Sequence, residues 1–400
     1  MAKILGIGNA VLDIIFNVSH HPKEDEEIRA LDKKTSSGGN TNNTLYVLNQ
    51  LGHETSICTT LATDSEAKQL TTSLKNRNIN IEHIQKFIKG QTPTSFVTLS
   101  SENGQRTIVH YRNLPEISFD HFARIEIEDY EWLHFEGRNI ENLTGMLNIA
   151  KTFLTDQPIS LEVEKPREGI EALFSQVNLL IFSHHYATAK GFQDGAKLLA
   201  NVKTQVPNAN IVCTWGNRGV WYAPINGDIQ HINAELITPI VDTLGAGDTF
   251  NAALIHHLIN KSTLLEAVKE ANHFAGQKCR QLGLDNLLDI TSDKKPLANL
   301  KQLTNAKTLI VNTESGRKSV VLIKYENSVK AYENNCPHQN VPLNEAYKID
   351  VNPFEKTIKC SVHDAFFKIE DGLCVDGPCW NESLATVDIE IDDNGDIYLV

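Results

Sequence analysis

The chain has 400 residues, of which 41% are hydrophobic and 22% charged, and 50 acidic against 37 basic residues give a formal net charge of −13. These proportions are typical of a folded globular protein, and the acidic surplus argues against a broad nucleic-acid surface. A chain of this length exceeds what one hydrophobic core usually supports, so we expect two domains. No apolar run reaches the roughly 20 residues that cross a bilayer, and residues 1–6 lack a secretion signal, so we expect a cytoplasmic protein with no membrane partner.

The first part of the chain alternates between strand and helix patterns. The apolar run 4–16 predicts a buried strand, and the apolar spacing over 41–51, after a glycine turn, predicts a helix. Residues 92–112 are typical of a β-hairpin with its turn at 102–104. Further strand patterns alternate with helical ones as far as a helix over 264–281. The alternation predicts an α/β domain with a mainly parallel sheet and helices on both faces.

The segment 241–250, VDTLGAGDTF, stands where an apolar run meets a predicted helix. Its small residues Gly245, Ala246 and Gly247 allow backbone N–H groups to close on an anion at the positive end of that helix. Asp248 then has two interpretations, which these ten residues do not separate. It is either a base that accepts a hydroxyl proton during phosphoryl transfer or a simple helix N-cap.

The pattern changes after residue 288. Residues 289–306 are rich in Asp, Ser and Lys and contain a proline, which is typical of a linker. Residues 307–400 show short strand patterns separated by turns. We therefore expect an α/β domain over 1–288, a linker, and an all-β domain over 307–400.

The second domain pairs one cysteine with one histidine twice. The pairs are Cys336 with His338 and Cys360 with His363. Two thiolates and two imidazoles suit Zn²⁺ or an iron–sulfur cluster, and a domain that has lost its metal is a third possibility. Each pair follows a short strand and opens a loop rather than a helix, which favours the cluster over a zinc finger. Two further cysteines at 374 and 379 are expected to be small packing residues nearby.

The first domain resembles the ribokinase (PfkB) family of sugar kinases, and most closely its ketohexokinase group. The motifs that carry the resemblance are HPKEDEEIR (21–29), GGNTNN (38–43), TPTSF (92–96), NGQRTIV (103–109), FEGRN (135–139), EVEKPRE (162–168), VDTLGAGDTFNA (241–252) and AGQKCRQLGLDN (275–286). The resemblance covers about residues 4–288 and implies ATP and Mg²⁺ as cofactors. It also implies a homodimer formed through a small β-lid, built from about 14–37 and 92–113.

The same resemblance implies roles for individual residues. Asp248 is the expected base, the amides of Gly245, Ala246 and Gly247 stabilise the transferring phosphoryl group, and Arg106 of the lid approaches sugar and phosphate. The expected sugar-binding residues are Asp13, Gly39, Asn40, Asn43 and Gln105, with Asp25 reaching into the partner's site. The expected nucleotide-binding residues are Gly216, Gly219 and Gly283, and the expected Mg²⁺ residues, acting through water, are Glu162 and Glu164. Because Gln105 stands where the family has Asn, kinase activity is implied more firmly than a preference for ketoses.

The second domain resembles Rieske ferredoxins in CPHQNVPL (336–343), CSVHDAFFKIEDG (360–372) and the later Gly377-Pro378. The resemblance implies a [2Fe-2S] cluster with Cys336 and Cys360 on the inner iron and His338 and His363 on the exposed iron.

This sequence departs from the Rieske pattern at several loop positions. Valines occupy the sites of the disulfide found in quinone-oxidising relatives, and Ala365 replaces a serine that donates a hydrogen bond to the cluster. The loss of a donor predicts a low reduction potential. Asn340 and Asp364 stand where glycine is usual, and both tolerate a positive φ better than other residues.

The sequence thus predicts an ATP-dependent kinase for the primary hydroxyl of a sugar, most closely a ketohexose such as fructose, giving the 1-phosphate. Its Rieske module serves electron transfer or redox sensing, and a redox partner protein is possible. Two alternatives stay open. The kinase fold could be a binding scaffold for a redox protein, or the kinase could act on another sugar or a nucleoside.

Overall fold

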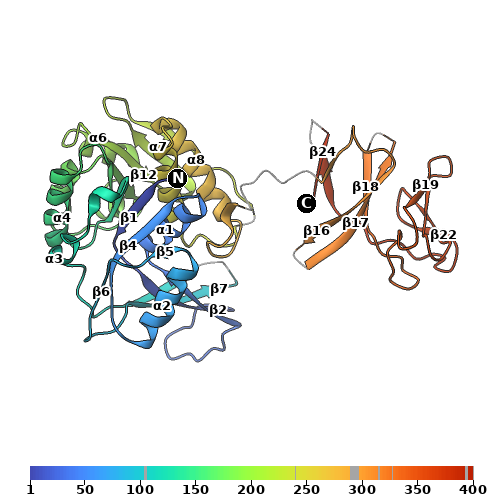
Figure 1. The fold of residues 1–400 in the computed structure, drawn as a ribbon, viewed down its shortest axis with the longest axis horizontal. Coiled ribbons are helices and arrows are strands. Elements are labelled where there is room, and N and C mark those ends of the chain that lie inside the picture. Colours follow the sequence, from blue (N-terminus) through green and yellow to red (C-terminus); the bar gives the residue numbers. More distant parts are fainter. Residues whose placement is uncertain are drawn as a thin grey trace. The chain divides into compact units, whose positions relative to one another are not determined.

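A computed structural model describes residues 1–102, 106–238, 240–288, 297–313, 316–326, 328–391 and 395–399. The chain divides into two compact units, Met1–Thr291 and Ser292–Val400 (Figure 1). Gln105 and the first part of the expected linker, residues 289–296, lie outside the described residues. The later part of that linker includes β15 (Ala298–Asn299), which pairs with β24 (Asp396–Leu399) inside the second unit.

The first unit is built on one large sheet of strand order β14-β13-β12-β11-β10-β9-β1-β4-β5, with β6 paired to β4. The strands are β1 (Lys3–Ile7), β4 (Glu54–Leu61), β5 (Ile79–Asn80), β6 (Ile84–Lys86), β9 (Trp132–Glu136), β10 (Ile159–Val163), β11 (Leu179–Ser183), β12 (Asn210–Thr214), β13 (Val220–Ala223) and β14 (Gln230–Ile232). All pairings from β5 to β12 are parallel, and only β13 and β14 add antiparallel strands at one edge. The carboxyl ends of the parallel strands therefore share one edge, where such sheets bind ligands.

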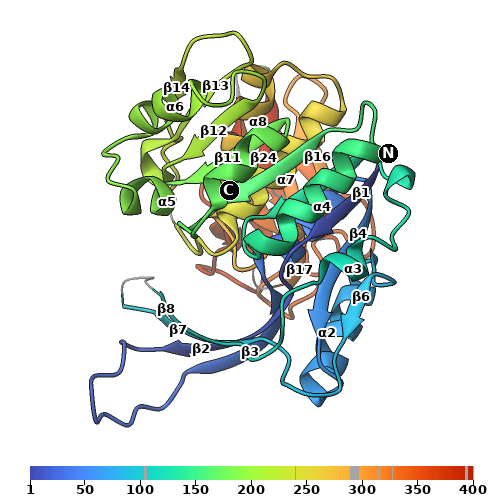
Figure 2. The same cartoon turned by 90° about the vertical axis from the view of Figure 1, so that its left-hand side faces the viewer.

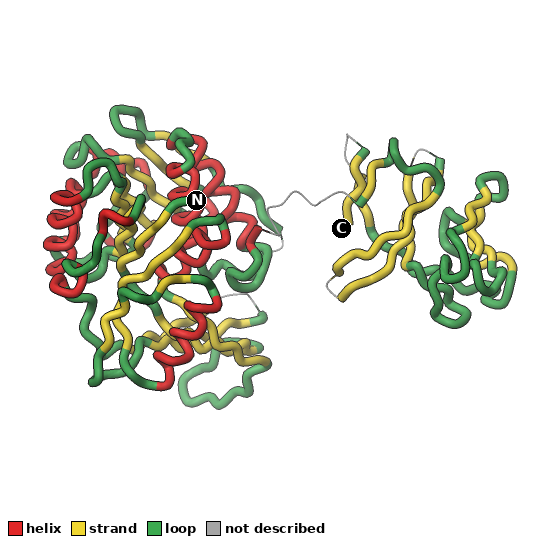
Figure 3. The backbone as a smooth tube through the Cα atoms, viewed as in Figure 1, coloured by secondary structure: helices red, strands yellow, loops and turns green. Residues whose placement is uncertain are grey.

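Helices cover both faces of this sheet, as Figure 3 shows. Successive strand residues point to opposite faces, so Ile4 joins one hydrophobic core while Leu5 and Ile7 join the other. The first core includes side chains of α1 (Asn40–Gln50), α2 (Ser65–Asn76), α7 (Ala246–Ile259) and α8 (Leu264–Lys278). The second includes side chains of α3 (Phe119–Phe122), α4 (Ile140–Phe153), α5 (His184–Ala189) and α6 (Gly195–Lys203). The predicted α/β architecture is confirmed.

A separate four-stranded sheet forms a lid, in the order β3 (Asp32–Gly38), β2 (Val11–Val18), β7 (Thr94–Ser100) and β8 (Arg106–Tyr111). Figure 2 shows these strands as a layer that projects from the helix-covered sheet. The side chains of Asp13, Ile15 and Asn17 line a pocket on one face. The register places Ile14, Phe96 and Val109 side by side on the other face. The lid therefore has a pocket-lining face of mixed polar and apolar side chains and an outer face that carries an apolar row.

The second unit consists of three antiparallel sheets, and no helix occurs among its described residues. They are β16 (Ala306–Thr313), β17 (Gly316–Tyr325) and β18 (Ser328–Glu333); β19 (Asp350–Asn352), β20 (Thr357–Lys359), β21 (Phe366–Lys368) and β22 (Cys374–Asp376); and β15, β24 and β23 (Ile389–Ile391). The predicted all-β module is confirmed. Across the described ranges of the chain, no helix combines the length and apolar character that crossing a membrane requires.

Candidate active site and candidate metal centre

Asp248 lies in the first turn of α7, at the carboxyl-end edge of the sheet. The helix is capped by Gly245, whose φ of 79° is left-handed, and Asp248 sits three residues further along. The N-cap interpretation of Asp248 is therefore wrong: a glycine holds that position, and no side chain makes the capping bond. Instead the Asp248 Oδ2 atom accepts a 2.7 Å hydrogen bond from Asn43 Nδ2 of α1.

The surroundings of Asp248 adjust its proton affinity. Its side chain is buried, with 8% exposure, and this burial is the largest cause that raises its pKa to about 7. The hydrogen bond from Asn43 and the charge of Lys278 lower the pKa, while Glu164 and Glu136 raise it further. A carboxylate with a pKa near neutrality is suited to accept a proton at physiological pH.

A second carboxylate, Glu162 at the end of β10, has the features of a cation ligand. Its Oε1 atom accepts hydrogen bonds from Asn40 Nδ2 at 3.2 Å and Asn251 Nδ2 at 3.1 Å. Its Oε2 atom is buried without a hydrogen-bond partner among the described residues. Burial, and after it the nearby acids led by Asp248, raise its pKa. A buried, unpaired carboxylate oxygen next to Glu164, which also accepts a bond from Asn40, suits Mg²⁺.

Of the predicted sugar-binding residues, two lie in the pocket beneath the lid, and Gly39 and Asn40 are not among the residues that line it. Asp13 and Asn43 both line the pocket between lid and sheet. Burial raises the pKa of Asp13 to about 6, although a hydrogen bond from Ser95 and the charge of Arg77 oppose this. The carboxylate lies against Gly38, where an added Cβ would stand 1.8 Å from Asp13 Oδ2. The following Gly39 has a φ of 98°, and a Cβ there would stand 2.5 Å from the carbonyl oxygen of Asn9.

Other predicted residues divide between those that line this pocket or contact the glycine turn and those that do neither. Arg106 of the lid donates a 3.0 Å hydrogen bond to Thr243 Oγ1, so the lid touches the glycine turn. Gly283 lines the pocket, and its amide donates a 3.0 Å bond to Asp242 Oδ2. Asp25 is exposed in the loop between β2 and β3 and is not among the pocket-lining residues.

Gly216 and Gly219 follow β12 and are also absent from the pocket lining. Gly219 is required by its backbone, because it has a φ of 81° and an added Cβ would stand 2.0 Å from the carbonyl oxygen of Ile232.

The sequence analysis missed two buried charged residues of this site. Glu136 ends β9, and its Oε2 atom accepts bonds from Asn9 N at 2.8 Å and Thr41 Oγ1 at 3.0 Å. Lys278 ends α8 fully buried and forms an ion pair with Asp242. Both left a signal in the sequence. Glu136 is an acid at the end of an apolar strand, and Lys278 is a lysine on the apolar face of a helix.

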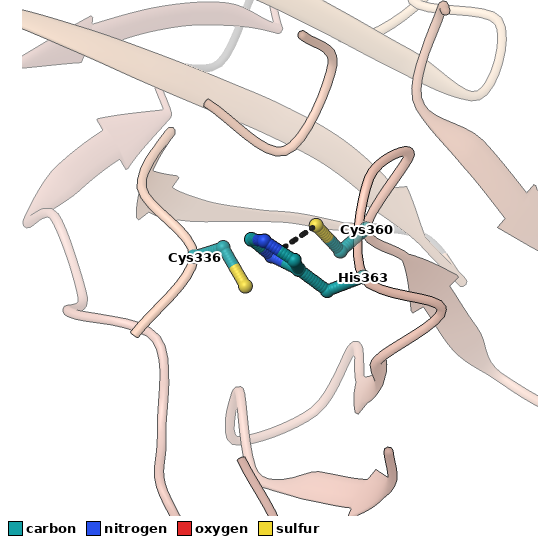
Figure 4. Close-up of side chains that lie close together, drawn as sticks. All are labelled: Cys336, Cys360 and His363. Carbon is teal, nitrogen blue, oxygen red and sulfur yellow. Dashed lines mark hydrogen bonds between the residues drawn. The ribbon is translucent and has the colours of Figure 1, made fainter. Parts of the chain in front are cut away.

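The candidate metal centre gathers ligands from two loops of the second unit. In Figure 4 the side chains of Cys336 and Cys360 point toward the imidazole of His363, and ligand atoms of these three residues lie within 4.8 Å of one another. Cys360 Sγ and His363 Nδ1 are 3.7 Å apart. The ring of His338 lies 4.4 Å from that of His363, measured between centroids. Two buried thiols with two imidazoles on the more exposed side fit a mixed cysteine and histidine cluster site.

The loops around this centre keep the expected geometry despite their substitutions. Asn340 and Asp364 have φ angles of 55° and 52°, the left-handed conformation for which glycine is usual. Cys374 and Cys379 are buried with their sulfur atoms 3.3 Å apart, and, like His338, they are not in the group of three ligand atoms found among the described residues. This is the packing position that the sequence predicted for them.

Comparison with known proteins identifies the first unit. Residues 1–291 match the family described as pfkB family carbohydrate kinase. The chain belongs to this family of kinases. A ketohexokinase from Mus musculus is 34% identical over 294 residues, covering 72% of this chain and 99% of that protein. The kinase therefore uses ATP and Mg²⁺ to phosphorylate a sugar, and the unpaired oxygen of Glu162 fits the metal.

Solved structures show the same fold for the kinase domain. A putative ribokinase from Agrobacterium tumefaciens has a TM-score of 0.63 at 20% identity, covering 70% of this chain and 92% of that one. A ribokinase from Arabidopsis thaliana complexed with ribose and ATP has a TM-score of 0.58 at 19% identity, with coverages of 73% and 99%.

Residues 293–388 of the kinase match the Rieske [2Fe-2S] domain. The cysteines and histidines described above fit the [2Fe-2S] cluster of such a domain. The protein is thus a sugar kinase that carries a C-terminal iron–sulfur domain.

Proposed function

We propose that the kinase domain transfers the γ-phosphoryl group of MgATP to the primary hydroxyl of a ketohexose such as fructose, giving the 1-phosphate. The similarity to a ketohexokinase over nearly the whole of that protein supports this acceptor. The observation that carries the proposal is Asp248, a buried carboxylate with a pKa of about 7 that is hydrogen-bonded to the pocket-lining Asn43. A pure binding scaffold has no use for such a group, which argues against the redox-scaffold alternative.

In the proposed reaction Asp248 accepts the proton of the attacking hydroxyl. The amides of Gly245, Ala246 and Gly247, at the positive end of α7, stabilise charge on the transferring group together with Arg106. We assign binding of the sugar hydroxyls to Asp13, Gly39, Asn40, Asn43 and Gln105. We assign binding of the nucleotide to Gly216, Gly219 and Gly283. Mg²⁺ near Glu162 and Glu164 offsets the negative charge of the phosphates.

The kinase proposal is tested by measuring ADP release with a panel of ketoses, aldoses and nucleosides. We expect the highest kcat/KM with a ketohexose and product phosphorylated on the primary hydroxyl. A higher kcat/KM with an aldose or a nucleoside would reassign the acceptor. If folded protein turns over none of these compounds, the redox-scaffold alternative is favoured. Asp248→Asn is expected to lower kcat by about 10²- to 10⁴-fold while MgATP still binds. Retained activity in this variant would refute the base assignment.

We propose that the Rieske domain transfers electrons or senses redox state with a partner protein. Its support is the exposure of His338 and of Val362, the residue before His363, which would give a partner access to the ligand side of the centre. The test is a redox titration of the full-length protein, followed by the sugar panel with oxidised and reduced protein. A reversible one-electron transition is expected; colourless protein that holds zinc and no iron would contradict the assignment.

We propose that the kinase is a homodimer that joins through the outer face of the lid. Phe96 and Val109 are 47% and 65% exposed on that face, although they are neighbours in an apolar row. An exposed apolar row on the face of a sheet is costly in water and is commonly covered by another chain. In the dimer, Asp25 of the lid loop would contribute to the partner's sugar site. Light scattering of the wild type and of Val109→Lys tests this, and a wild-type monomer at all concentrations would contradict it.

A further inference from the structure

Lys278 is a buried cation that the proposed reaction does not use. It ends α8 with a side chain that has no exposed surface, and its Nζ atom donates 2.8 Å hydrogen bonds to both the carbonyl oxygen and Oδ2 of Asp242. Removing a lysine ammonium from water is costly unless it is paired and hydrogen-bonded. Because burying this ammonium costs free energy, we ask which parts of the protein it holds in place.

The partner of Lys278 organises two segments at once. Asp242 Oδ1 accepts a 2.8 Å bond from the amide of Leu244, which leads into the glycine turn. Asp242 Oδ2 accepts a 3.0 Å bond from the amide of Gly283 in the segment that follows α8. One carboxylate thus holds the turn before Gly245 at a fixed separation from the segment at Gly283, an expected nucleotide-binding residue, which is called the nucleotide loop below.

Further contacts make the two segments a single unit. The carbonyl oxygen of Cys279, the residue after Lys278, accepts bonds from the amides of Val241 at 2.8 Å and Asp242 at 3.2 Å. Gly245 lies directly against Leu284, because an added Cβ would stand 3.0 Å from that side chain. Since Lys278 holds both the backbone and the side chain of Asp242, it fixes the peptide plane from which the turn departs.

We propose that Lys278 is a positioning residue, whose buried ion pair with Asp242 aligns the phosphate turn Gly245–Gly247 with the nucleotide loop at Gly283. The inference rests on the proposed roles of that turn and that loop. Hydrogen-bond donors that stabilise a transition state act through their fixed orientation, so a small displacement of the turn lowers the rate. The segment at Gly283 moves with it, whereas the sugar-binding side chains of Asn43 and Asp13 make their hydrogen bonds to Asp248 and Ser95.

The test uses the full-length protein with Lys278→Met, which keeps an unbranched side chain as far as the ε position and removes the ammonium group. The matched control is Lys269→Met, an exposed lysine on the same helix. We expect Lys278→Met to lower kcat at least about tenfold and to raise the KM for MgATP at least about threefold, with the KM for the sugar within about twofold of wild type. Lys269→Met is expected to match wild type in all three constants.

Because Lys278→Met leaves the carboxylate of Asp242 buried without its partner, the single variant is accompanied by the double variant Lys278→Met with Asp242→Asn. The double variant removes both charges, so we expect its melting temperature to return toward that of wild type while kcat stays low. Recovery of both melting temperature and kcat would show that Lys278 serves folding alone and would overturn the proposal.

A rescue experiment gives a readout that a purely structural role would not move. Lys278→Ala lacks the propylammonium part of the side chain, so n-propylammonium chloride is expected to restore kcat at least about fivefold, and tetramethylammonium chloride, which donates no hydrogen bond, is not. Equal effects of the two salts, or a kcat of Lys278→Met within about twofold of wild type, would overturn the proposal.

Two measurements separate a failure of this proposal from a failure of the proposed reaction. One is the calorimetric affinity of Lys278→Met for MgATP, which needs no sugar, and the other is the activity of Asp248→Asn. If Asp248→Asn is inactive and Lys278→Met binds MgATP like wild type, only the role of Lys278 is refuted.

Discussion

The pKa of Asp248 predicts how the kinase responds to pH. Because burial raises this pKa to about 7, about 10% of the carboxylate is ionised at pH 6 and about 90% at pH 8, so kcat/KM for the sugar should rise about tenfold between them. The sign follows from the role of a base, which must be deprotonated to accept a proton, so activity is lost as pH falls. Below pH 6 the decline should steepen, because the pKa of Asp13 is raised to about 6.

The variant Asn43→Ala tests the cause of this value. The amide of Asn43 donates a 2.7 Å hydrogen bond to Asp248 and favours the ionised carboxylate. Hydrogen bonds to charged groups are worth about 1.5–3 kcal/mol, and 1.36 kcal/mol corresponds to one pKa unit. Loss of the Asn43 bond should therefore raise the pH at which kcat/KM falls to half its plateau by about one unit or more. A one-unit move makes the increase from pH 6 to pH 8 about fiftyfold rather than tenfold.

The assay is the pH dependence of kcat/KM from pH 5.5 to 9, with each profile normalised to its own plateau so that weaker sugar binding does not enter. Asn49→Ala is the matched control, because Asn49 lies on the same helix and its side-chain amide donates hydrogen bonds to the backbone carbonyls of His53 and Asn78. Its profile should coincide with that of wild type. A flat wild-type profile between pH 6 and 8 would refute the assignment of Asp248. If the pH at which kcat/KM falls is the same in Asn43→Ala as in wild type, the hydrogen bond from Asn43 does not lower the pKa of Asp248.

Three further predictions concern the sugar pocket and the metal centre. Gly38→Ala places a methyl group against Asp13 and should raise the sugar KM roughly 5- to 150-fold, the equivalent of about 1–3 kcal/mol of overpacking, whereas Gly276→Ala on α8, with ordinary contacts only, should not. Cys336→Ser should abolish iron and acid-labile sulfide in the purified protein, and normal iron content would remove this residue from the ligand set. The double variant Cys374→Ala with Cys379→Ala should keep its iron and visible spectrum but lose roughly 1–2 kcal/mol of unfolding free energy, and loss of the iron would show that these thiols take part in binding the cluster.

Much of this protein followed from local patterns in its sequence. Apolar runs alternating with helical spacing predicted the covered parallel sheet, because that periodicity is imposed by which faces are buried. The glycine turn before Asp248 and the two cysteine–histidine pairs were visible because each combines its chemistry within a few residues. The positive φ of Asn340 and Asp364 was likewise predictable from the tolerance of these two residue types.

The tertiary structure decided which distant residues act together. The sequence shows neither that Asn43 bonds to Asp248, 205 positions away, nor that the carboxylates of Glu136 and Glu164 help to raise its pKa. It also left open whether Asp248 caps the helix, and only the left-handed backbone of Gly245 answered this. Lys278 and Asp242 show the physical reason most clearly. The sequence indicates each charge by its own neighbours, but the energy that keeps both buried comes from their contact across 36 residues of chain.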